Sequence, residues 1–144
     1  MFWFNKNNPD ALFCDCREVA EQLCDGRTIE IKPDMVCDVT ALPFPDESFW
    51  HIVFDPPHLI DAGEKSWMFK RYGRLPKDWR NFISQGFSEC WRVLKTNGTL
   101  IFKWNECDLP VGKIIKAIGK EPLYGQKVSN LGTHWLCFVK LREI

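Results

Sequence analysis

The order of apolar and helix-like segments predicts an α/β protein with a mostly parallel central sheet and helices on both faces. Short apolar runs typical of strands alternate along the chain with segments whose apolar residues recur at helical spacing. The run 49–54 is continuously apolar, aromatic and β-branched, which is typical of a strand buried on both faces of a parallel sheet. The length of 144 residues predicts one compact domain, residues 1–144.

The first third of the chain predicts short strands and one helix. Apolar runs closed by polar residues or proline predict the strands, and helical spacing of apolar residues predicts a helix over 18–24, ended by the turn at 25–26. The strands are expected at residues 11–14, 28–31 and 35–37.

The remainder predicts further strands and helices around one long loop. Residues 59–76 are polar and aromatic, are interrupted by two glycines and have no sustained period, which predicts a functional or disordered loop. A helix is expected to begin after Asp78, which can cap it, and to end at Asn97 and Gly98. The other elements are expected at 49–54, 99–104 and 133–141 as strands and at 111–118 as a helix.

Composition excludes some classes of protein. Basic and acidic residues are balanced at 19 each, so nucleic-acid binding would need a local basic patch. Apolar runs are far shorter than the roughly 20 residues that cross a bilayer, and residues 1–6 do not read as the n-region or h-region of a signal peptide. We therefore expect no membrane association and a cytoplasmic location.

The cysteines do not form a recognisable framework. Seven is an odd number, and no Cys-x-x-Cys pair occurs. We expect free thiols and no metal, with a zinc set drawn from residues 14, 16, 24 and 37 as the alternative.

Three segments of the sequence resemble segments of one enzyme family and occur in the same order. Residues 33–49 contain Asp38, a Leu-Pro-Phe turn at 42–44 and a Ser-Phe pair at 48–49. Residues 53–58 read Val-Phe-Asp-Pro-Pro-His, and residues 90–101 run through a glycine turn into a strand. Together these segments resemble Rossmann-like class I S-adenosylmethionine-dependent methyltransferases. Residues 55–58 are similar to the Asp-Pro-Pro-Tyr/Trp signature of enzymes that methylate exocyclic amino groups of DNA or RNA bases.

The resemblance implies that residues 55–58 are catalytic. An amino nitrogen held by a carboxylate and a backbone carbonyl would be oriented for methyl transfer, which fits Asp55 and Pro56. Pro57 would help to pre-organise the loop, and His58 would stack on the base in the place of tyrosine or tryptophan. The alternative is that Asp-Pro-Pro is only a turn that ends a strand.

The resemblance also implies an S-adenosylmethionine site at the strand ends. The family's first strand normally opens into a glycine-rich loop, whereas residues 14–18 contain no glycine. Glu30 is expected on the ribose hydroxyls with Asp34 as a rival, and Asp38 near the adenine, with turn capping as its alternative. The implied cofactor-binding residues are Asp15, Cys16, Glu30, Asp38, Val39 and Asp55.

Residues 61–80 are expected to contact a nucleic acid substrate. This segment holds six basic and three acidic residues interleaved with aromatic ones, which suits phosphates and unstacked bases. A solvated loop whose aromatic rings pack on the core is the alternative. Lys103 and Trp104 end a strand near the expected pocket, with simple packing as their alternative.

Two other functions stay open. The Leu-Pro-Phe turn is shared with small-molecule methyltransferases. The missing glycine loop also fits a degenerate, cofactor-binding subunit of a larger complex. A homo-oligomer or a partner subunit is equally compatible with the sequence.

Overall fold

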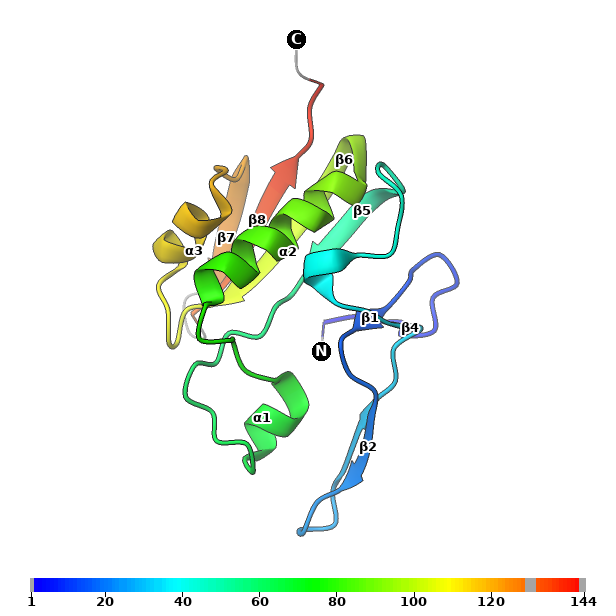
Figure 1. Ribbon diagram of the computed structural model, residues 1–144, viewed down its shortest axis with the longest axis vertical. Helices are drawn as coiled ribbons and strands as arrows, with labels where there is room; N and C mark the ends of the chain where they lie inside the picture. Colours follow the sequence, from blue (N-terminus) through cyan, green and yellow to red (C-terminus); the bar gives the residue numbers. More distant parts are fainter. Residues whose placement is uncertain (1, 129–131, 143–144) are drawn as a thin grey trace. The chain divides into compact units, whose positions relative to one another are not determined.

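The computed structural model describes residues 2–128 and 132–142 (Figure 1). The chain divides into two compact units, residues 1–38 and residues 39–144, here called unit 1 and unit 2. The prediction of one domain over residues 1–144 stays a prediction.

Unit 1 contains two small two-stranded sheets. Strand β1 (Cys14–Asp15) pairs in parallel with β4 (Met35–Val36), so the carboxyl ends of both strands lie at the same edge. Strand β2 (Val19–Gln22) pairs antiparallel with β3 (Thr28–Ile31). The strand predicted at 28–31 is confirmed, whereas those predicted at 11–14 and 35–37 are reduced to the two residues of β1 and of β4.

The helix predicted over 18–24 is wrong, because this segment forms strand β2 of a hairpin. Gly26 has φ 85°, and the N–H of Leu23 donates to the carbonyl of Arg27, which closes the hairpin turn. The Asp25 carboxylate also accepts the backbone N–H of Arg27 at 3.1 Å. The turn at 25–26 therefore reverses a strand, and a strand partner supplied by β3 outweighs a weak helical spacing.

Unit 2 is built on a four-stranded sheet in the order β5-β6-β8-β7. Strand β5 pairs in parallel with β6, while β8 is antiparallel to both β6 and β7. The sheet of this unit is therefore mixed, and the predicted mostly parallel arrangement is not confirmed. The strands are β5 (Phe49–Phe54), β6 (Leu94–Asn105), β7 (Tyr124–Val128) and β8 (Thr133–Val139).

Chain length explains the antiparallel pairs. Strands β7 and β8 are separated only by residues 129–132, and a parallel crossover needs a dozen or more residues. Strand β7 has no counterpart among the elements predicted from the sequence. Its tyrosine, glycine and polar residues lack the apolar run that predicts the other strands.

The two longer helices of unit 2 lie on one face of the sheet (Figure 1). Ile83 and Phe87 of α2 (Trp79–Val93) share a buried cluster with Ile114 of α3 (Val111–Ile118) and with strand residues that include Phe102. The predicted arrangement with helices on both faces is not found among the described residues of unit 2. Of all the described helices, none has the length and apolarity to cross a membrane.

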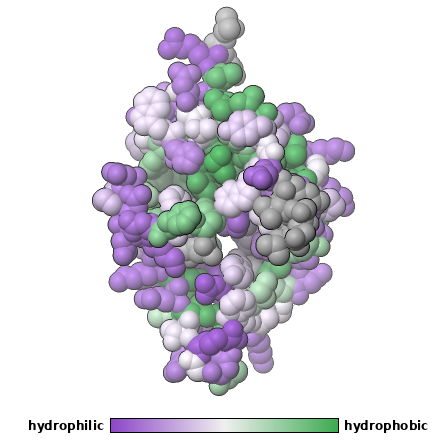
Figure 2. Space-filling model, turned by 180° about the vertical axis from the view of Figure 1, so that it is seen from behind, coloured by the Kyte–Doolittle hydropathy of each residue, from purple (hydrophilic) through white to green (hydrophobic). Residues whose placement is uncertain are grey.

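The opposite face of the sheet follows from the alternation along its strands. Phe54 and Phe102 are paired and point into the cluster beneath α2, so Val53 and Ile101, also paired, point to the other face. Cys137 pairs with Ile101 on that face. Figure 2 looks from this side and shows hydrophobic residues gathered among hydrophilic ones.

Two predicted boundaries differ from the structure. The segment 59–76, predicted as a loop, contains helix α1 (Trp67–Tyr72), which the Ser66 hydroxyl caps by accepting the N–H of Phe69 at 3.1 Å. Helix α2 ends at Val93 rather than at Asn97. Asn97 does adopt a positive φ of 66°, but it lies within β6 where the pairing with β5 shifts register. A local turn signal can mark a strand irregularity as well as a helix end.

The 49–54 strand and the 111–118 helix have the predicted bounds, and both are confirmed. A short 3-10 helix η1 (Val39–Ala41) opens unit 2. The final strand ends at Val139, two residues before the predicted end at Leu141.

Candidate functional site

The Asp-Pro-Pro-His segment follows β5 directly. Because β5 and β6 are parallel, Asp55 lies at the edge of the sheet where the carboxyl ends of both strands meet. Asp55 is exposed and Pro56 is buried, while Pro57 and His58 are half-buried. The structure therefore presents the aspartate to solvent on a loop that its prolines anchor.

Asp55 forms an ion pair with Lys103 of β6. The Lys103 ammonium lies 3.1 Å from Oδ1 and 3.0 Å from Oδ2, so it contacts both carboxylate oxygens. It also lies 5.8 Å from the centre of the Trp135 ring on β8. Lys103 was expected near the pocket from the sequence, but its pairing with Asp55 was not predicted, because 48 residues separate the two.

His58 packs beside Trp104 rather than standing alone. The two rings meet edge to face with centroids 6.4 Å apart, and the Trp104 indole N–H donates to the carbonyl of Leu109 at 2.9 Å. Burial lowers the pKa of His58. The nearby negative charge of Asp55 raises this pKa, whereas the positive charge of Lys103 lowers it. A neutral imidazole is therefore favoured at this position.

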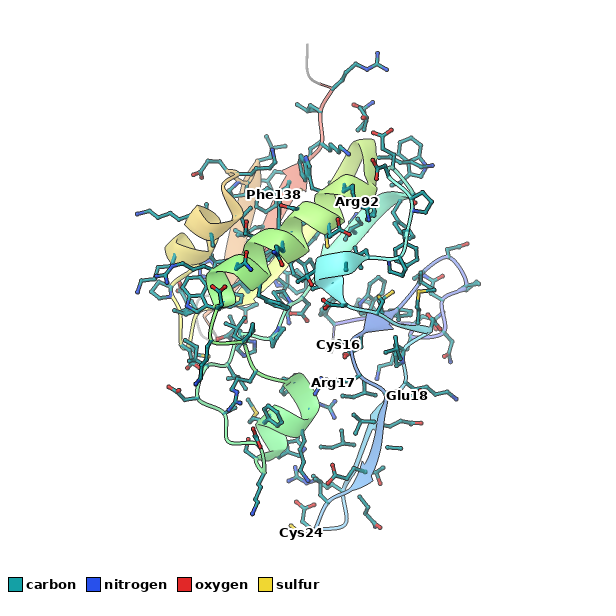
Figure 3. The ribbon with its side chains drawn as sticks, viewed as in Figure 1. Cys16, Arg17, Glu18, Cys24, Arg92 and Phe138 are labelled. Atoms are coloured by element: carbon teal, nitrogen blue, oxygen red, sulfur yellow. The ribbon has the colours of Figure 1, made fainter. Side chains whose placement is uncertain are left out.

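The Leu-Pro-Phe turn is fixed to helix α2 by Arg92 (Figure 3). Its guanidinium donates to the carbonyls of Leu42 at 3.0 Å and Phe44 at 2.9 Å, and it pairs with Asp46 at 2.7 Å. Glu89 accepts from the same guanidinium at 2.8 Å. No sequence signal identified Arg92, because its partners in this turn lie almost 50 residues away along the chain.

Three of the predicted cofactor residues lie together in unit 1. Asp15 ends β1, Cys16 follows it, and Asp38 comes two residues after β4, so all three lie at the carboxyl edge of the parallel β1–β4 pair. The Asp15 carboxylate accepts the backbone N–H of Arg17 at 2.9 Å. This bond closes the glycine-free turn after β1 (Figure 3).

The other predicted cofactor residues are placed differently. Glu30 lies on β3 and pairs with Ala20 across the hairpin, so it belongs to a sheet separate from β1 and β4. Val39 begins η1 and, like Asp55, belongs to unit 2. The structure therefore brings Asp15, Cys16 and Asp38 to one edge but does not bring Glu30 to it.

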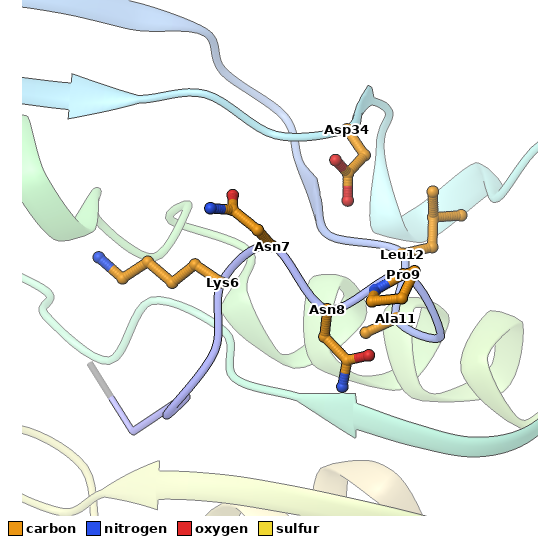
Figure 4. A pocket seen from close by; sticks show the side chains of 7 residues that line it. All are labelled: Lys6, Asn7, Asn8, Pro9, Ala11, Leu12 and Asp34. Atoms are coloured by element: carbon orange, nitrogen blue, oxygen red, sulfur yellow. The ribbon is translucent and has the colours of Figure 1, made fainter.

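Asp34, the rival of Glu30, lines an open pocket in unit 1 (Figure 4). The pocket has a volume of about 420 Å³. The Asp34 carboxylate also accepts the backbone N–H of Phe13 at 2.8 Å. The pocket is lined by residues 6–9, Ala11, Leu12 and Asp34.

The basic and aromatic residues of 61–80 contact one another. Arg71 lies over the ring of Trp67 at 5.6 Å, and Arg74 lies over that of Phe69 at 5.4 Å. Trp79 packs against the buried cluster of unit 2 and carries Arg80 over its ring at 4.5 Å. Cations stacked on half-buried rings keep their charge at the surface, so this segment is a basic surface with aromatic support.

The described cysteines of unit 1 are free thiols, and two of them are joined by a hydrogen bond. Cys14 lies against Cys37, and burial together with this hydrogen bond raises the pKa of Cys14 to about 12. Within residues 2–128 and 132–142, no cluster of three or more His, Cys, Asp or Glu residues is arranged to hold a metal ion.

The comparisons with known proteins give likenesses of structure. The sequence matches no family model and no curated protein. The crystal structure of the PH0226 protein from Pyrococcus horikoshii OT3 is 13% identical, with a TM-score of 0.53, over 75% of this chain and 58% of that one. This likeness shows a shared α/β fold, and the chain spans less than two thirds of that protein's length.

Weaker likenesses involve TTHA0409 from Thermus thermophilus, described as a candidate DNA modification methylase. One crystal structure is 13% identical with a TM-score of 0.47, covering 75% of this chain and 53% of that one. Its selenomethionine derivative is 12% identical with a TM-score of 0.44, covering 71% and 48%.

Proposed function

We propose that this chain is an S-adenosylmethionine-dependent methyltransferase that acts on the exocyclic amino group of a base in DNA or RNA. The observation that carries the proposal is the exposed Asp55 carboxylate at the carboxyl ends of two parallel strands, on a loop of the Asp-Pro-Pro type. Open α/β sheets bind ligands at this edge.

Asp55 and Pro56 hold the acceptor in this proposal. The carboxylate accepts one N–H of the amino group and the Pro56 carbonyl accepts the other, which orients the nitrogen lone pair. Proline fixes φ at positions 56 and 57, so little conformational freedom is lost when the acceptor binds. His58, kept neutral by burial, contributes a flat ring beside the base.

The residues at the edge of the β1–β4 pair fit the polar parts of the cofactor. The carboxylates of Asp15 and Asp38 can accept hydrogen bonds from its ammonium, hydroxyl and amino groups. Cys16, at the same edge, would contact its apolar parts. Bound S-adenosylmethionine supplies an electrophilic methyl group on a sulfonium.

The basic surface over 61–80 supports a nucleic acid acceptor. Its arginines lie over aromatic rings, and their positive charge would attract phosphates. An acceptor within a duplex would have to be flipped out of the base stack before Asp55 could reach its amino group.

Calorimetry with S-adenosylmethionine and S-adenosylhomocysteine tests the proposal first, followed by a methyl-transfer assay on DNA, RNA and a metabolite extract. We expect binding of both compounds and transfer to nucleic acid. Failure of both to bind at millimolar concentration would end the enzyme proposal for this chain. Transfer to the metabolite extract alone would identify a small-molecule methyltransferase instead.

Asp55→Ala separates the acceptor site from the cofactor site. We expect transfer to fall by ~100-fold or more, because the acceptor nitrogen loses its carboxylate, while cofactor affinity stays within a few-fold. Asp25→Ala is the matched control, since Asp25 is also an exposed aspartate in an ion pair, with Arg27 at 2.6 Å. A large loss of cofactor affinity in Asp55→Ala would show that Asp55 has been assigned the wrong role.

A further inference from the structure

Three side chains form a row across the sheet on the face opposite α2. Phe54 and Phe102 are paired and buried beneath the helix, so the next residues, Asp55 and Lys103, point to the other face. Lys103 in turn pairs with Trp135 of β8. The ammonium of Lys103 thus contacts a carboxylate just after β5 and lies near an indole ring on β8.

The position of this ammonium conflicts with acceptor binding. Its nitrogen lies 3.1 Å and 3.0 Å from the two oxygens of Asp55, where a donor contacting both oxygens must lie. In the proposed function, an amino nitrogen of the acceptor has to donate to this carboxylate. The acceptor must therefore displace Lys103 or share Asp55 with it.

The ion pair is of a kind that a ligand can open. The Lys103 side chain is 26% exposed and that of Asp55 is 37% exposed, so water screens their attraction and can solvate both when they separate. The Trp135 ring, 5.8 Å from the ammonium, offers it a second favourable contact. Lys103 carries a flexible side chain whose charge can follow an anion.

We propose that Lys103 is a gate that selects acceptors bearing a phosphate, an inference that rests on the proposed function. The amino group of the acceptor displaces the Lys103 ammonium from Asp55, and the displaced ammonium pairs with a phosphate of the same acceptor. A nucleoside without phosphate must break the Lys103–Asp55 ion pair and leaves the Lys103 ammonium without an anionic partner. A nucleotide or nucleic acid offers this ammonium a phosphate in place of the Asp55 carboxylate.

The test compares adenosine and cytidine with their 5′-monophosphates as methyl acceptors. The variants are Lys103→Met, which removes the charge, Lys103→Arg, which keeps it, and Lys95→Met as the matched control. Lys95 is another lysine of β6 over an indole ring, that of Trp50 at 4.7 Å. For the wild type we expect kcat/KM at least ~10-fold higher with the monophosphates, as one added charge-assisted contact allows.

Lys103→Met should bring this ratio to within about two-fold of one, raising KM for the monophosphates and lowering it for the nucleosides. Lys103→Arg and Lys95→Met should keep the wild-type preference. A wild type without preference, or a Lys103→Met enzyme that keeps it while kcat falls equally for both acceptors, would overturn the gate. The second result would mean that Lys103 only supports the strand.

A binding measurement keeps the gate distinct from the proposed function. We expect adenosine or cytidine 5′-monophosphate to shift the side-chain Nζ resonance of Lys103, assigned by its loss in Lys103→Arg, whereas the nucleosides shift it less. If no transfer is seen but the resonance responds in this way, the methyltransferase proposal fails and the gate stands as a nucleotide-binding feature. If transfer occurs but the resonance responds equally to both, the gate fails alone.

Discussion

His58 combines partial burial with a set of charged neighbours. Burial lowers its pKa from the usual 6.5, Asp55 and Asp108 raise it, and Lys103 lowers it. A ring next to Trp104 that stays neutral can lie against a base without carrying a charge into the site. The ionisable ring of His58 therefore links the candidate site to pH.

We predict that His58→Gln flattens the acid side of the stability profile. The folded protein binds the His58 proton less readily than the unfolded chain, so this contribution to stability is present above pH 6.5 and is lost as pH falls below that value. Chemical unfolding measured between roughly pH 7.5 and pH 5 should show a smaller loss in the variant. The control is His51→Gln, which replaces an exposed histidine on β5. An identical acid loss in wild type and His58→Gln would contradict the prediction.

We also predict that Asp38→Asn weakens binding of S-adenosylhomocysteine by ~10-fold, because a neutral amide accepts hydrogen bonds less strongly than a carboxylate. Isothermal calorimetry gives the affinity. Asp25→Asn in the hairpin of the same unit removes an equal charge away from the β1–β4 edge and should leave binding unchanged. Equal losses in both variants would point to a general charge effect.

Strand β6 illustrates how one element serves both the fold and the site. Its alternate residues Leu100, Phe102 and Trp104 fill the cluster beneath α2, and Lys103 between them reaches Asp55. Near its start the strand passes so close to β5 that a side chain cannot be accommodated at position 98. A Cβ on Gly98 would lie 2.8 Å from the carbonyl oxygen of Trp50.

Gly98→Ala should therefore lower the free energy of unfolding by ~1–3 kcal/mol, since the added methyl would also lie 2.7 Å from the Lys95 carbonyl oxygen. Gly112→Ala is the opposite case. A Cβ there meets nothing within 4 Å, and alanine in helix α3 should add ~0.5–1 kcal/mol. Urea unfolding measures both, and a Gly98→Ala protein as stable as the wild type would show that the β5–β6 approach relaxes easily.

At the scale of the whole molecule, the buried cluster belongs entirely to unit 2. Its members run from Phe54 to Phe138, and the partly buried residues packed on it begin at Val39. Unit 1 instead consists of two-stranded sheets, which are marginal in water unless something else supports them.

We predict that a fragment comprising residues 39–144 folds by itself and unfolds cooperatively, because it retains the whole cluster. Circular dichroism during thermal unfolding would measure this. An unfolded 39–144 fragment would mean that residues 1–144 form one cooperative domain, as the sequence alone predicts. Residues 1–38 tested in parallel should show no cooperative transition.

Elements whose signals are local could be predicted from the sequence. Strand 49–54 and helix 111–118 have their predicted bounds, because a continuous apolar run and a helical period are properties of neighbouring residues. The Asp-Pro-Pro-His loop was located for the same reason. Its prolines restrict the backbone wherever they occur.

Features that depend on residues distant in the sequence could not be predicted in this way. Residues 19–22 became a strand because 28–31 pair with them, and the direction of β7 and β8 followed from a short connection. Arg92 donates hydrogen bonds to the Leu-Pro-Phe turn, whose Leu42 lies 50 residues away along the chain. Lys103 forms an ion pair with Asp55, which lies 48 residues away. Strand register places Lys103 beside the carboxylate, and no local pattern encodes that register.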